Sequence, residues 1–239
     1  MTSSTSTPPI SALTSMGHIP PTTKKIEGIE VIPKWRYPEI MRTLTIWRNF
    51  VEILKENRVA SVVRSSKEDF LLSDSRFTLT LLISILELRK DFPSPLHTFL
   101  TAIDSKGKVQ AVLSLYHHRE SLEILQFATA PWNLSLPLHK LNKEEIPPDL
   151  SLELETHHRT PIDEIISPLK GGGTLLIDAA YRLGQREGKK ELTLRSTYSA
   201  IPFYEKLGMK KGQALQFFYP IDPGTIPAEL IEALAKLRR

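Results

Sequence analysis

The sequence predicts an α/β (α+β) domain built around a mixed, mostly antiparallel sheet. Two early segments carry apolar residues at the three- and four-residue steps of a helix. Three consecutive segments then alternate with the period of strands, and the last third alternates between helix and strand. The resulting order of strand, helix, helix, three strands, helix, strand, helix and strand indicates one domain in which helices cover a sheet.

Ordered structure is expected to begin with a short strand at Ile26 to Lys34, broken at Pro33. A helix is expected over Pro38 to Arg58, because proline suits a first helical turn and the apolar residues there share one face. These apolar residues are Ile40, Leu44, Trp47, Val51 and Leu54. A second helix is expected over about Ser75 to Lys90, and two prolines just beyond it prevent its continuation.

The next three segments are expected to form an antiparallel meander of strands. They read HTFLTAID (97–104), VQAVLSLYHHR (109–119) and SLEILQFATA (121–130). Gly107 lies between the first two and supplies a hairpin turn.

The stretch from Pro131 to Lys170 has no clear periodicity and contains six prolines. Forty such residues are long for a connection within a domain. We therefore expect an irregular excursion from the core that acts as a lid or as a partner surface.

A regular alternation resumes after the glycines Gly171, Gly172 and Gly173. A helix with one apolar face follows them and ends at Gly188. The remaining elements are expected to be a strand in KELTLRS (190–196), a short helix in SAIPFYEKLG (199–208), a strand in LQFFYPI (215–221) and an amphipathic helix in PAELIEALAKLRR (227–239).

Composition narrows the class of protein. The chain has 239 residues, a net charge of +4 and no cysteine, which excludes disulfides, thiolate metal sites and an acyl-cysteine intermediate. Its longest apolar run is shorter than the roughly 18 residues of a membrane span.

Residues 1–25 are rich in Ser, Thr and Pro and are expected to form a disordered tail, with a targeting signal as the alternative. A single domain is expected over 26–239. A cytoplasmic protein without nucleic-acid or membrane partners is the expectation.

The three glycines suggest an anion site. A helix start exposes unpaired N–H groups and the positive end of the helix dipole, and glycines let a phosphate approach closely. Lys170, Gly171, Gly172, Gly173 and Thr174 thus form a candidate phosphate cradle, the alternative being a flexible turn. The loop lacks the Lys-Ser/Thr pair of nucleoside-triphosphate sites, and Leu176 replaces the last glycine of the dinucleotide motif.

Three blocks of the sequence resemble the GNAT superfamily of acyl-CoA N-acyltransferases. PLKGGGTLLIDAA is similar to the family's Arg/Gln-x-x-Gly-x-Gly/Ala helix start, although Pro168 replaces the Arg or Gln. TYSAIPFYEKLGM is similar to its Asn-x-x-Ala-x-x-x-Tyr-Glu-Lys-Leu-Gly-Phe block, with Thr197 in place of Asn. LEILQFATAP looks like its central strand. The resemblance covers residues 121–204 and implies a GNAT-type sheet with a splay between two parallel central strands.

The resemblance also implies a binding mode for acetyl-CoA, the expected co-substrate. The pyrophosphate would lie on the loop from Lys170 to Thr174. The pantetheine arm would run beside Phe127, Ala128 and Thr129, with Thr197 and Ala200 completing the site.

Two residues are candidates for proton transfer. Tyr204 aligns with the family's tyrosine and is the candidate general acid at sulfur; the alternative is that it only packs. Glu123 is the candidate general base, four residues before Phe127 on the central strand; the alternative is an exposed glutamate. A backbone N–H near Ala128 or Thr129 would meet the oxyanion.

These expectations add up to an N-acetyltransferase that transfers an acetyl group from acetyl-CoA to an amine by direct attack in a ternary complex. The acceptor is a small molecule or a protein, no metal is expected, and the terminal helix could pair two copies as a homodimer. The alternatives are a non-catalytic acyl-CoA-binding or regulatory module and an interaction protein that has lost the ligand.

Two histidine pairs, His117–His118 and His157–His158, are not expected to bind a metal ion. Neighbouring side chains of a strand point to opposite faces, so neither pair could chelate a metal through both rings from a strand. Trp132 and Asn133 either shape the acceptor site or anchor the excursion.

Overall fold

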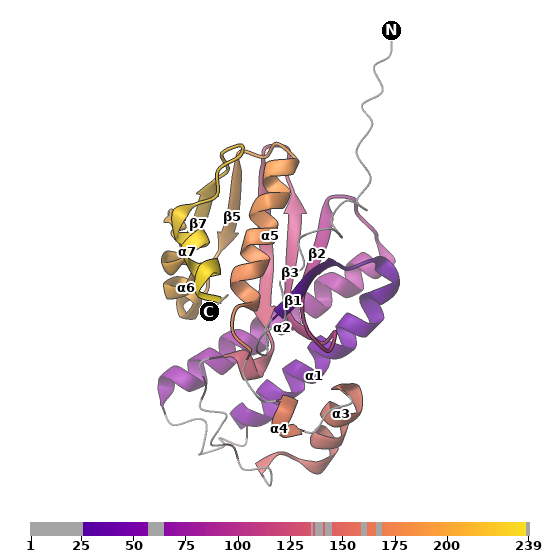
Figure 1. Ribbon diagram of the computed structural model, residues 1–239. Helices are drawn as coiled ribbons and strands as arrows, with labels where there is room; N and C mark the ends of the chain where they lie inside the picture. The colour runs from indigo at the N-terminus through magenta and orange to yellow at the C-terminus, as the bar shows by residue number, and fades with distance from the viewer. Residues whose placement is uncertain are drawn as a thin grey trace.

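A computed structural model describes residues 26–56, 65–134, 136, 141, 145–158, 162–165 and 169–237. The predicted tail at 1–25 lies outside these residues. The described chain forms a seven-stranded sheet in the order β1-β2-β3-β4-β5-β7-β6 (Figure 1). The strands are β1 (Ile26–Val31), β2 (His97–Asp104), β3 (Val109–His117), β4 (Ser121–Thr129), β5 (Glu191–Arg195), β6 (Lys210–Lys211) and β7 (Gln216–Pro220).

The sheet is antiparallel except between β4 and β5. These two strands pair in parallel from Ser121 to Ile124 on β4 and from Glu191 to Leu194 on β5. Beyond Ile124, β4 continues to Thr129 with β3 as its partner on one side, and on the other side no strand of the described chain pairs with it. The prediction of a mixed, mostly antiparallel sheet with two splayed parallel strands is therefore confirmed.

Helices cover both faces of this sheet and enclose two cores. The helices are α1 (Tyr37–Glu56), α2 (Ser66–Asp91), α3 (Pro148–His158), α4 (Ile162–Ile165), α5 (Gly172–Arg186), α6 (Ile201–Lys206) and α7 (Ala228–Leu237). The first four bury their apolar residues on one face, together with Phe99, Val112 and Ala128 of the sheet. The other three pack on the opposite face, where α5 runs along the strands (Figure 1). None of the helices in the described part has the length and apolar character that crossing a bilayer requires.

Helix α2 begins at Ser66 rather than near Ser75. Ser65 caps it: the Ser65 hydroxyl accepts the N–H of Lys67 at 3.2 Å and also donates to the Glu68 carboxylate. This Ser-x-x-Glu start was the signal in the sequence for the two missing helical turns. The difference matters because those turns form part of the candidate site.

The stretch from 131 to 170 is not irregular where the structure describes it, so that expectation was wrong. It contains a 3-10 turn at Pro131–Asn133 and helices α3 and α4. Leu150, Leu154 and His158 recur at four-residue steps on α3 and are buried in the core of α1 and α2. In Figure 1, α3 and α4 extend that helical layer. The prolines obscured this periodicity.

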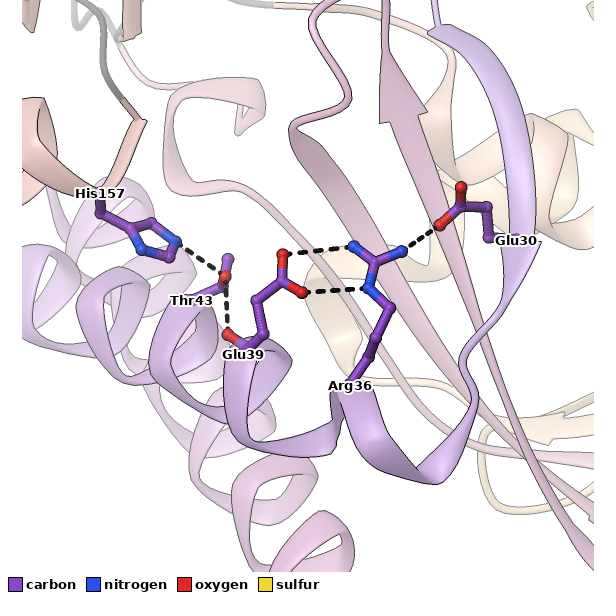
Figure 2. Close-up of polar contacts among 5 residues, drawn as sticks. All are labelled: Glu30, Arg36, Glu39, Thr43 and His157. Atoms are coloured by element: carbon purple, nitrogen blue, oxygen red, sulfur yellow. Dashed lines mark hydrogen bonds and ion pairs between the residues drawn. The ribbon is translucent and has the colours of Figure 1, made fainter.

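Polar contacts fasten the first elements to one another and to α3 (Figure 2). Arg36 lies in a 3-10 turn, Lys34–Arg36, and its guanidinium bonds Glu30 of β1 and, through two nitrogens at 3.0 and 3.2 Å, Glu39 of α1. One turn further along α1, the Thr43 hydroxyl donates to the Glu39 carbonyl and lies 2.9 Å from His157 Nε2. The network fixes where α1 starts relative to the edge strand.

Acid should destabilise this layer through His158. Burial lowers the pKa of His158 to about 4 from an ordinary value of 6.5. Between these values the unfolded chain binds the proton and the folded chain does not. The contribution of His158 to the free energy of unfolding is therefore fully present above pH 6.5 and is lost as the pH falls towards 4. A shift of this size in one group changes the free energy of unfolding by about 3 kcal/mol between the two pH limits.

Urea unfolding at pH 7 and pH 4.5 checks this prediction. The His158→Phe variant should lose less stability between the two pH values than the wild type. It should keep part of the loss, because burial lowers the pKa of His97 in the same direction. Equal losses in the two proteins would contradict the assignment.

Candidate functional site

A cavity of about 510 Å³ opens where β4 and β5 diverge. Its wall is formed by the second half of β4, one face of α2, the glycine loop with the start of α5, and the segment from the end of β5 into α6. All of the predicted cofactor residues lie in this wall: Phe127, Ala128, Thr129, Lys170, Gly171, Gly172, Gly173, Thr174, Thr197 and Ala200. The fold thus brings together four separate stretches of the chain.

The glycine loop presents backbone donors to the cavity. Gly171 caps α5 in the left-handed region at φ 105°, and its carbonyl accepts the N–H of Leu175 at 3.0 Å. The helix therefore starts within the glycines rather than after them. Among the described residues, no acceptor meets the N–H groups of Gly172, Gly173 and Thr174. A helix start of this kind attracts an anion.

Gly173 also allows two aromatic rings to pack against the start of α5. A Cβ at this position would lie 2.9 Å from Cζ of Phe127 and 3.1 Å from Cζ of Phe203. These two rings are stacked, with centroids 6.1 Å apart. Close packing is therefore one reason for this glycine, and it is independent of any ligand.

The open edge of β4 forms another part of the wall. Phe127, Ala128 and Thr129 pair with Leu113, Val112 and Ala111 of β3. On the β5 side, no strand in the part of the chain that the structure describes pairs with them. An extended amide ligand fits such an edge, because backbone N–H and C=O groups there can pair with it.

Tyr204 lies in the same wall, on α6. Its side chain is 5% exposed, and its ring packs against Phe203 and Phe217. Among the described residues, nothing forms a hydrogen bond with its hydroxyl. Burial raises the pKa of Tyr204, so the phenol stays protonated at neutral pH. The residue packs in the core and also borders the cavity, a position that is compatible with either predicted role.

Glu123 is the one predicted site residue outside the cavity wall. Its carboxylate lies 2.8 Å from His118 Nε2, next to the turn that connects β3 to β4. A bulge explains the separation: Leu115 pairs with Ile124 while Ser114 pairs with Gln126, so β4 holds one extra residue. The extra residue reverses the alternation, and Glu123 and Phe127 lie on opposite faces of the sheet.

Four residues of α2 that line the site were not singled out from the sequence. Leu71, Asp74, Ser75 and Thr78 line the cavity at the i, i+3, i+4, i+7 spacing of one helical face. The Ser199 hydroxyl donates to Asp74 Oδ2 at 2.5 Å and lies 3.0 Å from Thr197 Oγ1. Asp74 thereby connects α2 to the loop after β5. The signal in the sequence was a polar stripe beside the apolar one.

Asn133 anchors the chain that leads into the glycine loop. Its side-chain oxygen accepts the Leu169 N–H at 2.6 Å, and its amide nitrogen donates to Gln110 Oε1 at 3.1 Å. Trp132 lies beneath it in the core of α1 and donates to the same Gln110 oxygen at 3.2 Å. Of the two predicted roles, anchoring accounts for Trp132, while Asn133 both anchors the loop and lines the cavity.

The histidine pairs make separate contacts. His117 lies 2.8 Å from Glu187 and 2.9 Å from Thr98, and His118 bonds Glu123. His157 bonds Thr43, and His158 packs edge-on against Trp132. Within the described ranges, no three His, Cys, Asp or Glu side chains are grouped to hold a metal ion.

Comparisons with known proteins find a likeness in structure alone. No family model matches the sequence, and no curated protein matches it. The structure resembles Tetrahymena GCN5 at 14% identity and a TM-score of 0.40, over 67% of this chain and 92% of that one. It resembles the PaiA N-acetyltransferase of Thermoplasma acidophilum, solved with coenzyme A, at 14% identity and 0.39, over 81% and 99%. It also resembles the Vibrio cholerae spermidine N-acetyltransferase, solved with CoA and spermine, at 10% and 0.41, over 82% and 96%. Each of these likenesses is one of fold alone.

Proposed function

We propose that the chain is an acetyl-CoA-dependent N-acetyltransferase. One observation carries the proposal: unpaired amides of a helix start, an open strand edge and a buried tyrosine whose hydroxyl has no hydrogen-bond partner among the described residues border the same cavity. An acyl-CoA offers a pyrophosphate, an extended amide chain and a thioester in that order. Each part of the wall matches one part of such a molecule.

The donor is held by charge and by backbone. Gly172, Gly173 and Thr174 give their N–H groups to the pyrophosphate. Lys170, Arg195 and Lys206, the three cationic residues of the described wall, add positive charge around it. Phe127, Ala128 and Thr129 pair with the pantetheine amides, and Thr197 and Ala200 close the site from the loop after β5.

Transfer requires an uncharged amine and a stabilised thiolate. The nitrogen attacks the thioester carbon, a C–N bond forms, and the C–S bond breaks with its electron pair left on sulfur. Tyr204 hydrogen-bonds the developing thiolate and relays to it a proton that the nitrogen loses. A backbone N–H near Ala128 or Thr129 stabilises the oxyanion. A base role for Glu123 would require a bridging water, because its carboxylate does not border the cavity.

The position of Glu123 favours one second candidate. A non-catalytic acyl-CoA-binding module would use the same cradle and strand edge and would make no use of Glu123. It differs from the enzyme in one respect: it binds the donor and transfers nothing to any amine.

Calorimetric titration with acetyl-CoA and with CoA tests the proposal first. We expect micromolar dissociation constants, which correspond to about 8 kcal/mol of binding free energy. CoA should bind with similar affinity, since the phosphates and pantetheine supply most contacts. Absence of heat and of a thermal shift with both ligands would refute the donor site and the enzyme with it. Binding without acetylation across a panel of amines would favour the non-catalytic module.

A further inference from the structure

The face of α2 that lines the cavity carries an acidic side chain, whereas a helix face packed in a core carries apolar side chains. Leu71, Asp74, Ser75 and Thr78 share this face of the helix, and three of them are polar. Asp74 is the one carboxylate among the described residues that line the cavity. It lies within the two turns that the capping residues Ser65 and Glu68 add to α2.

Asp74 is held in place and still has acceptor capacity. Ser199 donates to its Oδ2, and Thr197 Oγ1 lies 3.0 Å from the Ser199 oxygen. Within the described chain, Oδ1 makes no hydrogen bond and the carboxylate makes no ion pair. A carboxylate oxygen with free lone pairs and no cation in contact with it is available to a cation that a ligand brings.

The cations of the wall do not supply that partner. Lys170, Arg195 and Lys206 belong to the glycine loop, the end of β5 and the end of α6, and none is within salt-bridge distance of Asp74. Their charge is matched by the donor's phosphates under the proposed function. The carboxylate of Asp74 is left for the other substrate.

We infer that Asp74 binds the ammonium group of the acceptor and takes its proton, so that the acceptor is a cationic alkylamine with no carboxylate beside the amine. This inference rests on the proposed function. Ser199 and Thr197 are positioning residues that hold the Asp74 carboxylate towards the cavity. A carboxylate next to the reacting amine would lie close to Asp74 and be repelled by it.

The proton balance of this step closes. The ammonium R–NH₃⁺ gives one proton to Asp74, whose carboxylate becomes the acid and later releases the proton to water. After nitrogen attacks the thioester carbon, its second proton passes through Tyr204 to sulfur. The net reaction converts ammonium and thioester into amide, thiol and one free proton.

Thiol release from acetyl-CoA with pentylamine and with norleucine tests the inference. These probes share a carbon chain and differ by the α-carboxylate. We expect the wild type to use pentylamine with a kcat/KM at least about tenfold above that for norleucine. Asp74→Asn should lower kcat/KM for pentylamine by about 10²–10³-fold, the range of a general base. Its acetyl-CoA Kd should stay within about twofold, because no donor-binding group changes.

The pH profile separates a catalytic from a structural role. Without Asp74, the rate should rise with pH towards the amine pKa of about 10, since only the free amine then reacts. Asp74→Glu should keep the preference for pentylamine because it keeps the charge. Asp69→Asn, a change of the same type on an exposed part of α2, is the matched control and should leave the rates unchanged.

Three results would overturn the inference. The first is equal use of norleucine and pentylamine by the wild type. The second is full activity of Asp74→Asn, or of Ser199→Ala if the first variant does not fold. The third is acetyl-CoA binding without any transfer to pentylamine, which leaves the donor site intact. Failure of acetyl-CoA to bind at all would instead refute the proposed function.

Discussion

Tyr204→Phe is expected to slow acetyl transfer by about 10²–10³-fold while leaving the Kd for acetyl-CoA within about twofold. The variant removes one hydroxyl and keeps the ring that packs against Phe203 and Phe217. Among the described residues this hydroxyl has no hydrogen-bond partner, so its loss leaves no buried group unsatisfied. Stability should therefore change little, and the effect should appear in kcat.

A second buried tyrosine gives the matched control. Tyr219 is 2% exposed, and its hydroxyl donates to the Leu207 carbonyl, which closes α6. Tyr219→Phe should cost about 1 kcal/mol of unfolding free energy with a small effect on kcat, the reverse of the Tyr204 pattern. Steady-state kinetics and urea unfolding of both variants check this. Full activity of Tyr204→Phe would leave Tyr204 with a packing role alone.

The wall of the cavity could be predicted from the sequence where it follows from chain order. β4, the glycine start of α5 and the tyrosine of α6 follow in this order along the chain, with α3 and α4 between the first two, and each lies in one of the three sequence blocks with a family resemblance. Once two parallel strands splay, their facing edges and the helix start between them must border one space. Ten predicted cofactor residues and Tyr204 accordingly share one cavity wall.

The predictions were least complete where a distant contact or a local irregularity decides the geometry. Asp74 meets Ser199, 125 positions later, through the packing of α2 beside the end of β5, and no local pattern encodes that contact. The face of the sheet on which Glu123 lies depends on whether Leu125 forms a bulge in β4 opposite β3. A strand sequence shows its alternation but not a bulge, since the bulge arises from pairing with the neighbouring strand.

Gly173→Glu should weaken acetyl-CoA binding by more than about 100-fold, or about 3 kcal/mol. The new carboxylate would compete with phosphate for the amides of Gly172 and Thr174 and would repel it, although an acid at a helix start is itself favourable for the helix. Steric cost enters as well, because any Cβ here meets the ring of Phe127 at 2.9 Å.

Gly173→Gln separates these two effects. Gln and Glu share the same Cβ and nearly the same shape, so both variants displace Phe127 and Phe203 equally and should unfold at similar urea concentrations. The difference between their acetyl-CoA dissociation constants then measures the charge alone, and we expect at least about tenfold weaker binding for Glu. If both variants lost stability and their affinities for acetyl-CoA were equal, no phosphate would lie on these amides. Gly173 would then serve only the packing of the two rings, and the charged donor would have to be held elsewhere in the cavity.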